Sequence, residues 1–418
     1  MKKLSALVLL FISVFVYAQT DTLIWSPSAT FPDISTAGQY NESVVVGDTL
    51  YAHITAAGGA STTIDKYVIN DPLLGGGTWI TGETPLPTAL VGGFMVECGG
   101  MIYYIGGSGT GVTTAGDAVY CYDPSTGVWT TKASMPTPLS GHGAVAWGDS
   151  VIFVMGGPWS TSTTTNLEVY YYRVGSDTWG TNTGTSGLPS GAGRRAFAIG
   201  IDGNSIIIAG GYAGQYIHSA YVGTIGTDAT DITWAQINDF PGAVGLSRPG
   251  GTAIDGNFFL VGGEKDGGGY GDTTHVYNFA SGTWLYSFPG KPTGVSNIFN
   301  SVSAKMLAND TVAIFVPGGY NGAGIAGFEV AKFYDPNSTV GISETEDEYL
   351  NVYPNPATNM INIQATNADV VEIYNVQGQL MDVVDLREST QVNIEGYAKG
   401  VYVIRLQNSS FVTRFVKE

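Results

Sequence analysis

Six copies of one pattern, each about 50 residues long, follow one another along this chain of 418 residues. Each copy contains an apolar run that ends in two glycines, a second run with tyrosine and a polar turn, and the first five copies continue to a tryptophan. The clearest copy is 101–129. The glycine pairs stand 48 to 56 residues apart, at Gly58-Gly59, Gly106-Gly107, Gly156-Gly157, Gly210-Gly211, Gly262-Gly263 and Gly318-Gly319. Such a period indicates a supersecondary unit that buries its faces against its neighbours.

Tryptophans keep the same interval and indicate how the array ends. Five follow the tyrosine run of their own copy, at Trp79, Trp129, Trp179, Trp234 and Trp284, whereas Trp25 precedes the first copy. In the second copy, apolar alternation and turn residues predict strands over 92–97, 101–105, 118–122 and 128–132. We therefore expect six four-stranded sheets, with the segment around Trp25 supplying the outermost strand of the last one and closing a ring.

The order strand with Gly-Gly, tyrosine with Asp-Pro, then tryptophan resembles the kelch repeat, most fully in YIGG followed by YCYDPSTGVW. The resemblance covers roughly residues 20–338 and implies a six-bladed β-propeller. The expected fold class is all-β, with a propeller over 19–338 followed by a small antiparallel β-sandwich.

The chain is acidic, and its charge argues against nucleic acid as a partner. Asp and Glu number 35 against 17 Lys and Arg, which gives a formal net charge of −18. No basic cluster occurs beyond Lys2-Lys3 and Arg194-Arg195, so phosphate backbones would be repelled.

The first 18 residues have a basic start, an apolar core and small residues before Gln19, which is the layout of a secretory signal peptide. We expect cleavage after Ala18 and export. No later stretch has 18 consecutive apolar residues, so no transmembrane helix is expected. In an exported protein Cys98 and Cys121 can form a disulfide, or they can remain two small buried side chains.

After Pro336 the repeat stops, and an acidic linker is expected at 339–349. Residues 350–418 alternate apolar strands with Asn-Pro, Gln-Gly and Asn-Ser turns, which predicts a small antiparallel sandwich. This tail resembles the type A C-terminal sorting domain of the type IX secretion system at Tyr353, Pro354, Asn355, Pro356, Gly378, Gly400, Val401 and Tyr402. The resemblance implies a Bacteroidetes-type cell, recognition by the secretion machinery, and release or attachment to the outer surface of the outer membrane.

Ligand sites are expected where loops enter the inner strands or follow the glycine pairs, because in a propeller both sets open on one face around the central channel. These loops carry aromatic rings, guanidinium groups and carboxylates, which suit a sugar or a small carboxylate. The candidate ligand-binding residues are His142, Trp159, Arg194, Arg195, Tyr212, Tyr216, Arg248, Glu264, Tyr270 and Tyr320.

Each candidate also has a structural interpretation. A tyrosine or tryptophan can seal its blade against the next one. The three arginines can donate hydrogen bonds to loop carbonyls, as kelch arginines often do. Glu264 can be a solvated loop acid.

Two enzyme families with kelch blades define the catalytic alternatives. Gly263-Glu264 resembles the Gly-Glu of six-bladed sialic acid mutarotases (N-acetylneuraminate epimerases), which implies an acid–base role for Glu264. The arginine expected a few residues later is missing from 267–271, and Arg248 or Arg195 would have to replace it. Galactose oxidase relatives hold copper with two His and two Tyr. Here the four histidines, His53, His142, His218 and His275, fall in four different repeats. No copper, other metal or cofactor is therefore expected.

Repetition without a defined acid–base constellation favours a non-catalytic binding module for a glycan or protein ligand. A carbohydrate-active enzyme of mutarotase type, with Glu264 as its catalytic residue, is the first alternative. A purely structural surface protein is the second.

Overall fold

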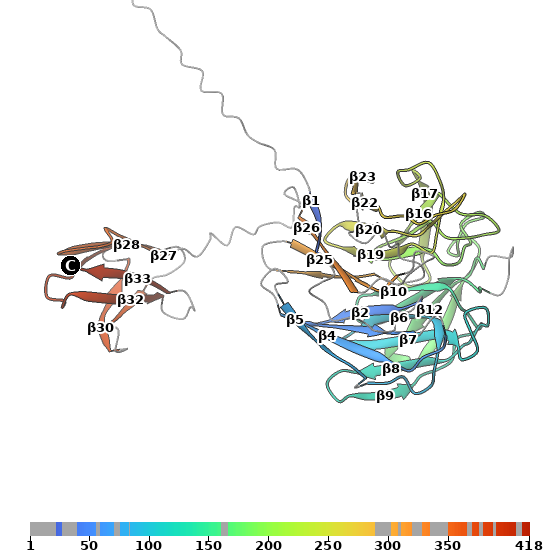
Figure 1. Ribbon diagram of the computed structural model, residues 1–418, viewed down its shortest axis with the longest axis horizontal. Helices are drawn as coiled ribbons and strands as arrows, with labels where there is room; N and C mark the ends of the chain where they lie inside the picture. Colours follow the sequence, from blue (N-terminus) through green and yellow to red (C-terminus); the bar gives the residue numbers. More distant parts are fainter. Residues whose placement is uncertain are drawn as a thin grey trace, which may run out of the picture. The chain divides into compact units, whose positions relative to one another are not determined.

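The computed structural model of the chain describes residues 22–26, 40–55, 59–70, 76–82, 84–159, 166–288, 302–307, 311–319, 328–334, 350–365, 370–375, 379–387, 390–406 and 412–418. The signal peptide and linker expected from the sequence, together with Tyr320 and Gly378, lie outside these residues. Within them the structure is all-β, with one 3₁₀-helix and no α-helix (Figure 1). The chain divides between Ser338 and Thr339 into two compact units.

Six four-stranded antiparallel sheets, here called blades 1 to 6, form the described part of the first unit. Blade 1 contains β2 (Glu42–Val46), β3 (Thr49–His53), β4 (Ile64–Asn70) and β5 (Gly76–Ile80). Blade 2 contains β6 (Val91–Cys98), β7 (Met101–Ser108), β8 (Val119–Asp123) and β9 (Val128–Thr131). Blade 3 contains β10 (His142–Trp147), β11 (Val151–Gly156), β12 (Val169–Arg173) and β13 (Thr178–Asn182).

The remaining blades follow the same plan. Blade 4 contains β14 (Ala198–Asp202), β15 (Ser205–Ala209), β16 (Ala220–Ile225) and β17 (Ile232–Ile237). Blade 5 contains β19 (Gly250–Ile254), β20 (Asn257–Val261), β22 (Thr274–Asn278) and β23 (Thr283–Phe288). Blade 6 contains β24 (Ser303–Met306), β25 (Thr311–Pro317), β26 (Phe328–Tyr334) and β1 (Thr22–Ser26). A short ribbon pairs β18 (Leu246–Ser247) with β21 (Glu264–Lys265).

The first strands of the six blades form a closed ring, which makes the unit a six-bladed propeller (Figure 1). Each first strand contacts the next one in the order β2, β6, β10, β14, β19 and β24, and β24 contacts β2. Polar bonds close the ring between blades 1 and 6. Asn41 Nδ2 donates to the Pro317 carbonyl at 2.9 Å, and the Ser43 and Ser303 hydroxyls lie 2.6 Å apart.

The outer strand of blade 6 comes from the other end of the unit. Strand β1 pairs antiparallel with β26, and Trp25 lies opposite Ala331. The prediction that the segment around Trp25 closes the last blade is confirmed.

Three of the glycine pairs link their blade to the next one, in blades 2, 3 and 4. The second glycine donates its N–H to a carbonyl of the following blade: Gly107 to Leu139 at 3.0 Å, Gly157 to Arg194 at 3.0 Å, and Gly211 to Leu246 at 2.7 Å. Both residues of these pairs have left-handed φ values, which glycine adopts readily.

The first glycine pair is not equivalent to the others. Because the hairpins of blades 1 and 2 have the same register, Ile54 of blade 1 corresponds to Gly106 of blade 2. The Thr55 N–H is bound by Asn41 Oδ1 at 3.0 Å. Assigning Gly58-Gly59 to this position was therefore wrong, because an asparagine side chain satisfies the backbone there.

Tyrosine and tryptophan of the repeat are neighbours within a blade. Ring centroids lie 5.0 Å apart for Tyr122 and Trp129, and 5.0 Å for Tyr172 and Trp179. The Trp179 indole donates to the Ala133 carbonyl at 2.8 Å. The pair therefore packs the third strand on the fourth and ties the fourth to the segment that precedes the blade.

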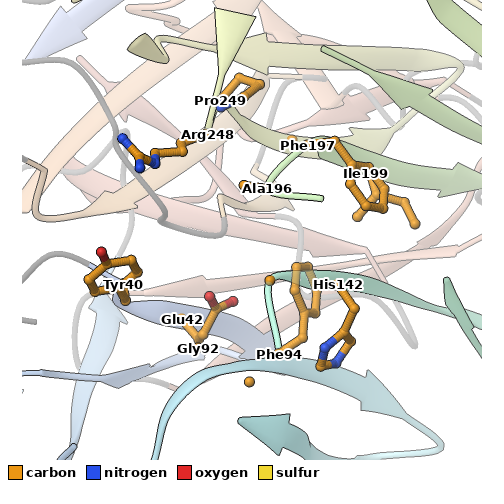
Figure 2. A pocket seen from close by; sticks show the side chains of 13 residues that line it. Tyr40, Glu42, Gly92, Phe94, His142, Ala196, Phe197, Ile199, Arg248 and Pro249 are labelled. Atoms are coloured by element: carbon orange, nitrogen blue, oxygen red, sulfur yellow. The ribbon is translucent and has the colours of Figure 1, made fainter. Parts of the chain in front are cut away.

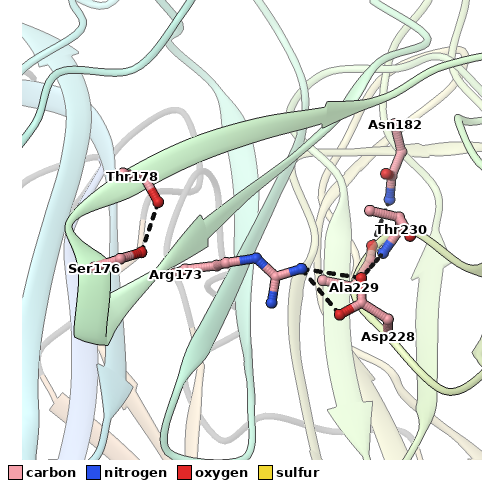
Figure 3. Close-up of polar contacts among 7 residues, drawn as sticks. All are labelled: Arg173, Ser176, Thr178, Asn182, Asp228, Ala229 and Thr230. Atoms are coloured by element: carbon pink, nitrogen blue, oxygen red, sulfur yellow. Dashed lines mark hydrogen bonds and ion pairs between the residues drawn. The ribbon is translucent and has the colours of Figure 1, made fainter.

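Side chains also join neighbouring blades away from the ring, as Figure 3 shows for blades 3 and 4. Arg173 Nη2 donates to both carboxylate oxygens of Asp228, at 3.0 and 2.9 Å. Asn182 Nδ2 donates to the Ala229 carbonyl at 2.7 Å. Cys98 and Cys121 are both free and buried, so the disulfide is absent and the packing alternative holds.

The second unit is a sandwich of two sheets around an apolar core that includes Ile361, Ile373 and Ile404. One sheet contains β27 (Leu350–Tyr353), β28 (Met360–Ala365) and β31 (Gln391–Asn393). The other contains β29 (Val370–Asn375), β30 (Leu380–Asp385), β32 (Gly400–Leu406) and β33 (Val412–Lys417).

Candidate ligand site at the channel mouth

Five residues with left-handed backbone surround one end of the central channel, and we call them the mouth ring. They are Tyr40, Gly92, Gly141, Ala196 and Arg248, with φ of 72°, 72°, 62°, 49° and 60°. Each lies six residues before the end of the first strand of its blade, so the five positions are equivalent.

Backbone hydrogen bonds run round the mouth ring from blade to blade. Gly141 N donates to Gly92 O at 2.9 Å, Ala196 N to Gly141 O at 2.8 Å, and Arg248 N to Ala196 O at 2.8 Å. Two of the five positions, Gly92 and Gly141, are glycines, which adopt left-handed φ values without steric cost. Tyr40, Ala196 and Arg248 adopt the same conformation with a side chain.

Inside the mouth ring lies a pocket of about 50 Å³. Its walls come from blades 1 to 5 and include Tyr40, Glu42, Phe94, His142, Phe197, Ile199, Arg248 and Pro249. Phe94, Ile199 and Gly251 also line a larger cavity of about 370 Å³ between the first strands of the six blades. These three residues therefore stand between the mouth pocket and the rest of the channel.

The mouth pocket has a polar side and an apolar side, as Figure 2 shows. Tyr40, Glu42 and Arg248 lie on one side, and Phe94, Phe197 and Ile199 on the other. Glu42 is only 5% exposed, and its carboxylate points into the pocket. Its charge adds to the effect of burial in raising the pKa of the fully buried Tyr104 behind it.

Two arginines and a tryptophan from blades 3, 4 and 5 meet beside the pocket. The guanidinium groups of Arg195 and Arg248 each lie over the Trp159 ring, 4.9 Å from its centroid. Arg195 also lies 4.7 Å from the Tyr212 centroid and donates to the Trp159 carbonyl at 3.0 Å. Burial lowers the pKa of Arg195, and the neighbouring Arg248 lowers it further.

Glu264 connects this cluster to the mouth ring. Its carboxylate accepts a hydrogen bond from Arg248, and the two side chains are 24% and 26% exposed. Burial, together with a hydrogen bond from the phenol to Glu264, raises the pKa of Tyr216 to about 12. Burial also raises the pKa of Tyr40, which Arg248 opposes.

The structure thus brings six sequence candidates together at the mouth: Trp159, Arg195, Tyr212, Tyr216, Arg248 and Glu264. Tyr270 joins them through its backbone, which forms a bridge with Glu264. Tyr320 lies outside the described residues.

Arg194 does not reach the mouth pocket, and here the structural interpretation is correct. Its side chain is fully buried, where Nε donates to the Ala192 carbonyl at 2.8 Å and Nη1 to the Gly210 and Ser219 carbonyls at 2.9 and 2.8 Å. Desolvation lowers its pKa to about 10. The guanidinium of Arg194 holds two loops of blade 4 together and is not available to a ligand.

His142 lines the pocket but is only 4% exposed, because its ring packs against Gly106 of blade 2. The contact is so close that a Cβ atom at Gly106 would lie 2.7 Å from His142 Cε1. Burial lowers the pKa of His142 to about 4, despite the opposing effect of the nearby Ile105 carbonyl. The ring is therefore neutral at physiological pH and seals two blades.

Sequence reasoning missed Tyr40 and Glu42, the two polar residues that blade 1 contributes. Aligning the repeats on their hairpin turns instead of their glycine pairs would have placed Tyr40 level with Arg248. The displaced glycine pair of blade 1 concealed this equivalence.

In the second unit, Asn355 of the sorting motif binds the last strand. Asn355 Nδ2 donates to the Arg414 carbonyl at 3.0 Å, and its Oδ1 accepts from Val416 N at 3.0 Å. Tyr402 is buried against Phe415, with ring centroids 5.3 Å apart, whereas Pro354 and Pro356 are exposed. Gly400 begins β32.

Other site types find little support among the described residues. No group of three or more His, Cys, Asp or Glu side chains there is arranged to hold a metal. His218 and His275 both lie next to Phe240, and His53 of blade 1 contacts Tyr104 of blade 2. In the part of the chain that the structure describes, no helix is long and apolar enough to cross a membrane.

Comparison with known proteins agrees with this architecture. The model of the KLHDC2/KLHL20/DRC7 Kelch-repeats domain matches residues 82–323, more than half of the chain. The chain belongs to the kelch-repeat family. A second model, the secretion system C-terminal sorting domain, matches residues 351–418 and confirms the type IX sorting tail inferred from the sequence. This kelch protein therefore carries an export signal at its C-terminal end.

Relatives of known name share parts of the kelch region. Kelch-like protein 35 of Mus musculus is 35% identical over 103 residues, which is 24% of this chain and 16% of that protein. Kelch-like protein 24a of Danio rerio is 50% identical over 48 residues, 12% of this chain and 8% of that protein. The solved structure of YjhT covers 73% of this chain and 98% of its own, with a TM-score of 0.57 and 14% identity, a likeness of fold.

Proposed function

We propose that this kelch protein is an exported binding module that holds a glycan or protein ligand at the mouth of its propeller. One observation carries the proposal. Three successive blades bring Trp159, Arg195 and Arg248 into contact beside a pocket that Glu42 and Tyr40 also line.

The chemistry of this surface suits a polar ligand better than an apolar one. The guanidinium groups of Arg195 and Arg248 donate in fixed directions and pair with carboxylates or hydroxyl groups. Tyr212 and Tyr216 add rings whose centroids lie 5.8 Å apart and can cover the C–H face of a sugar. The glycine pairs and the Tyr–Trp pairs, by contrast, are occupied in holding the blades.

Export places that surface outside the cell. The sorting domain indicates secretion or surface attachment. We take the partner of residues 350–418 to be the type IX secretion machinery of a Bacteroidetes-type cell. The protein would then be released into the medium or attached to the outer surface of the outer membrane. A signal peptide over residues 1–18 would begin this route.

A glycan array and a pull-down with the chain from Gln19 onward test the proposal. We expect the chain to bind a defined set of glycans, and Arg195→Ala to weaken that binding at least tenfold, about 1.4 kcal/mol. A blank array with capture of one protein would replace the sugar by a protein ligand. If the chain binds neither, the structural alternative holds.

The pairing of Arg248 with Glu264 favours one second candidate, a sugar mutarotase. The resemblance to sialic acid mutarotases requires an arginine near Glu264. Arg248, in the loop that enters β19 of blade 5, occupies that place. Proton transfer at an anomeric carbon would then use Glu264, with Arg248 holding a carboxylate of the sugar.

Exchange NMR with N-acetylneuraminate measures this activity directly. Faster anomeric exchange with the wild-type chain, lost in Glu264→Gln, would establish the enzyme. Anomeric exchange no faster than in buffer would rule out the mutarotase and leave the binding module as the proposed function.

A further inference from the structure

Three residues of the mouth ring, Tyr40, Ala196 and Arg248, have a side chain on a backbone conformation that disfavours one, and two of these side chains are large. Glycine occupies the equivalent position in blades 2 and 3, because φ near +60° brings an L side chain close to its own carbonyl. Tyr40 and Arg248 adopt this conformation nonetheless, and both line the mouth pocket. Strain of this kind is typical of functional sites, where a side chain is held in place at the expense of the backbone.

The mouth pocket is too small for a whole sugar ring. A cavity needs about 10–15 Å³ to hold one water molecule. The pocket, at about 50 Å³, therefore has room for roughly three to five small groups. The Phe94, Ile199 and Gly251 floor separates it from the wider channel. It can accept one short branch of a ligand whose remainder lies outside on Trp159, Arg195 and Tyr212.

The two sides of the pocket define the chemistry of that branch. Glu42 offers acceptor oxygens, Arg248 and the Tyr40 hydroxyl offer donors, and Phe94 and Phe197 offer apolar rings (Figure 2). The branch must therefore combine one donor, one acceptor and one apolar end. An acetamido group has all three in four heavy atoms: an N–H, a carbonyl oxygen and a methyl group.

We propose that the mouth pocket is a subsite for the acetamido group of an N-acetylated sugar. Its N–H donates to Glu42, its carbonyl accepts from Arg248 and Tyr40, and its methyl packs on Phe94 and Phe197. A hydroxymethyl branch matches the pocket less well, because its single oxygen serves the polar side and leaves the phenylalanines uncovered. This inference rests on the proposed binding function and names the class of sugar.

Titration calorimetry with matched sugars tests the subsite. The probes are N-acetylglucosamine against glucose, and N-acetylgalactosamine against galactose, each pair differing in one acetamido group. We expect the N-acetylated member of at least one pair to bind at least tenfold more tightly to the chain from Gln19 onward.

Variants identify the groups responsible. Glu42→Gln and Tyr40→Phe keep the shape of the side chain and are expected to weaken the N-acetylated sugar about five- to tenfold, as loss of one hydrogen bond does. Arg248→Gly restores the residue that blades 2 and 3 have, and should abolish the preference while the propeller stays folded. Asp255→Gly is the matched control. It replaces another left-handed residue, φ 52°, at the far end of the same β19 strand, and should leave binding unchanged.

The outcomes separate this inference from the binding function itself. Equal affinity for both members of each pair, or an unaffected Arg248→Gly, would overturn the acetamido subsite. A glycan array that is positive only for sugars without acetamido groups would also overturn it, yet would support the binding module. If no probe binds and the array is blank, the subsite and the glycan function both fail.

Discussion

Trp179 shows what a single residue of the repeat contributes to stability. Its indole N–H binds the Ala133 carbonyl, 46 residues earlier, while its ring packs on Tyr172. Trp234 occupies the same position in blade 4, but its indole nitrogen has no partner among the described residues, and its ring lies against Gly223. The two tryptophans differ mainly in one hydrogen bond and one tilted contact with a tyrosine ring.

We therefore expect Trp179→Phe to lower the free energy of unfolding by about 1–2 kcal/mol more than Trp234→Phe. Both variants lose the same ring volume, so the difference isolates the hydrogen bond and the contact with the Tyr172 ring. Urea unfolding of the full chain, followed by fluorescence, measures both. Equal losses would show that neither the bond to Ala133 nor the contact with Tyr172 contributes.

Individual residues also show which parts of the candidate site could be predicted from the sequence. The loops after the glycine pairs predicted Trp159, Tyr212 and Glu264, because loop position follows from the repeat. Arg194 and Arg195 are adjacent in sequence, yet one is buried among carbonyls and the other lies over Trp159. Nothing in the sequence distinguishes them, since the direction of a side chain depends on backbone angles that only the folded loop sets.

Strand β1 is the element on which closure of the propeller depends. It adds the fourth strand to blade 6, and Trp25 packs on the core of blades 5 and 6. Without it, β26 would expose a row of unpaired backbone groups along an edge.

A chain that starts at residue 27 therefore should be less stable than one that starts at Gln19. Losing the packing of the partly buried Trp25 alone costs about 2 kcal/mol. Urea unfolding gives the stability, and sedimentation velocity shows whether the exposed edge causes association. A synthetic peptide of residues 19–30 should restore the unfolding midpoint, whereas unchanged midpoints for the two chains would refute the role of β1 in closure.

The strands themselves were largely predictable, because alternation and turn residues are local signals. In blade 2 the expected 101–105 strand extends to Ser108, and the expected 128–132 strand ends at Thr131. The ribbon of β18 and β21 was not anticipated. Its two residues per strand carry no periodicity, and the pairing joins the loop that enters β19 to the loop that follows β20.

Across the propeller, three buried histidines link stability to pH. Burial lowers the pKa of His53, His142 and His275 to about 4 each, and they belong to blades 1, 3 and 5. An unfolded histidine has a pKa near 6.5, so between pH 6.5 and 4 the unfolded chain binds more protons than the folded one. Stability must then fall as the pH falls through this window.

The expected loss is about 3 kcal/mol for each histidine between pH 6.5 and 4, since one pKa unit corresponds to about 1.4 kcal/mol. Urea unfolding at pH 7, 6, 5 and 4.5 measures it. His142→Gln should flatten the profile by about a third. A stability that stays constant from pH 7 to 4.5 would mean that these rings reach water in the folded state.

The closed ring was predictable because six repeats about 50 residues apart and one early tryptophan leave few ways to complete the fold. What binds at its mouth was not, because Tyr40, Glu42 and Arg248 meet there from positions more than 200 residues apart. The equivalence of Tyr40 and Arg248 depends on register, and the glycine pair of blade 1 is out of register with the others.

The central claim, that the propeller mouth binds a glycan, is tested most directly on one glycan array with three proteins: the chain from Gln19 onward, Arg248→Gly and Asp149→Asn. Asp149 lines the channel cavity on the side away from the mouth pocket. We expect the wild-type and Asp149→Asn chains to bind the same glycans, and Arg248→Gly to lose them. Binding retained by Arg248→Gly, or no binding by the wild-type chain, would contradict the claim.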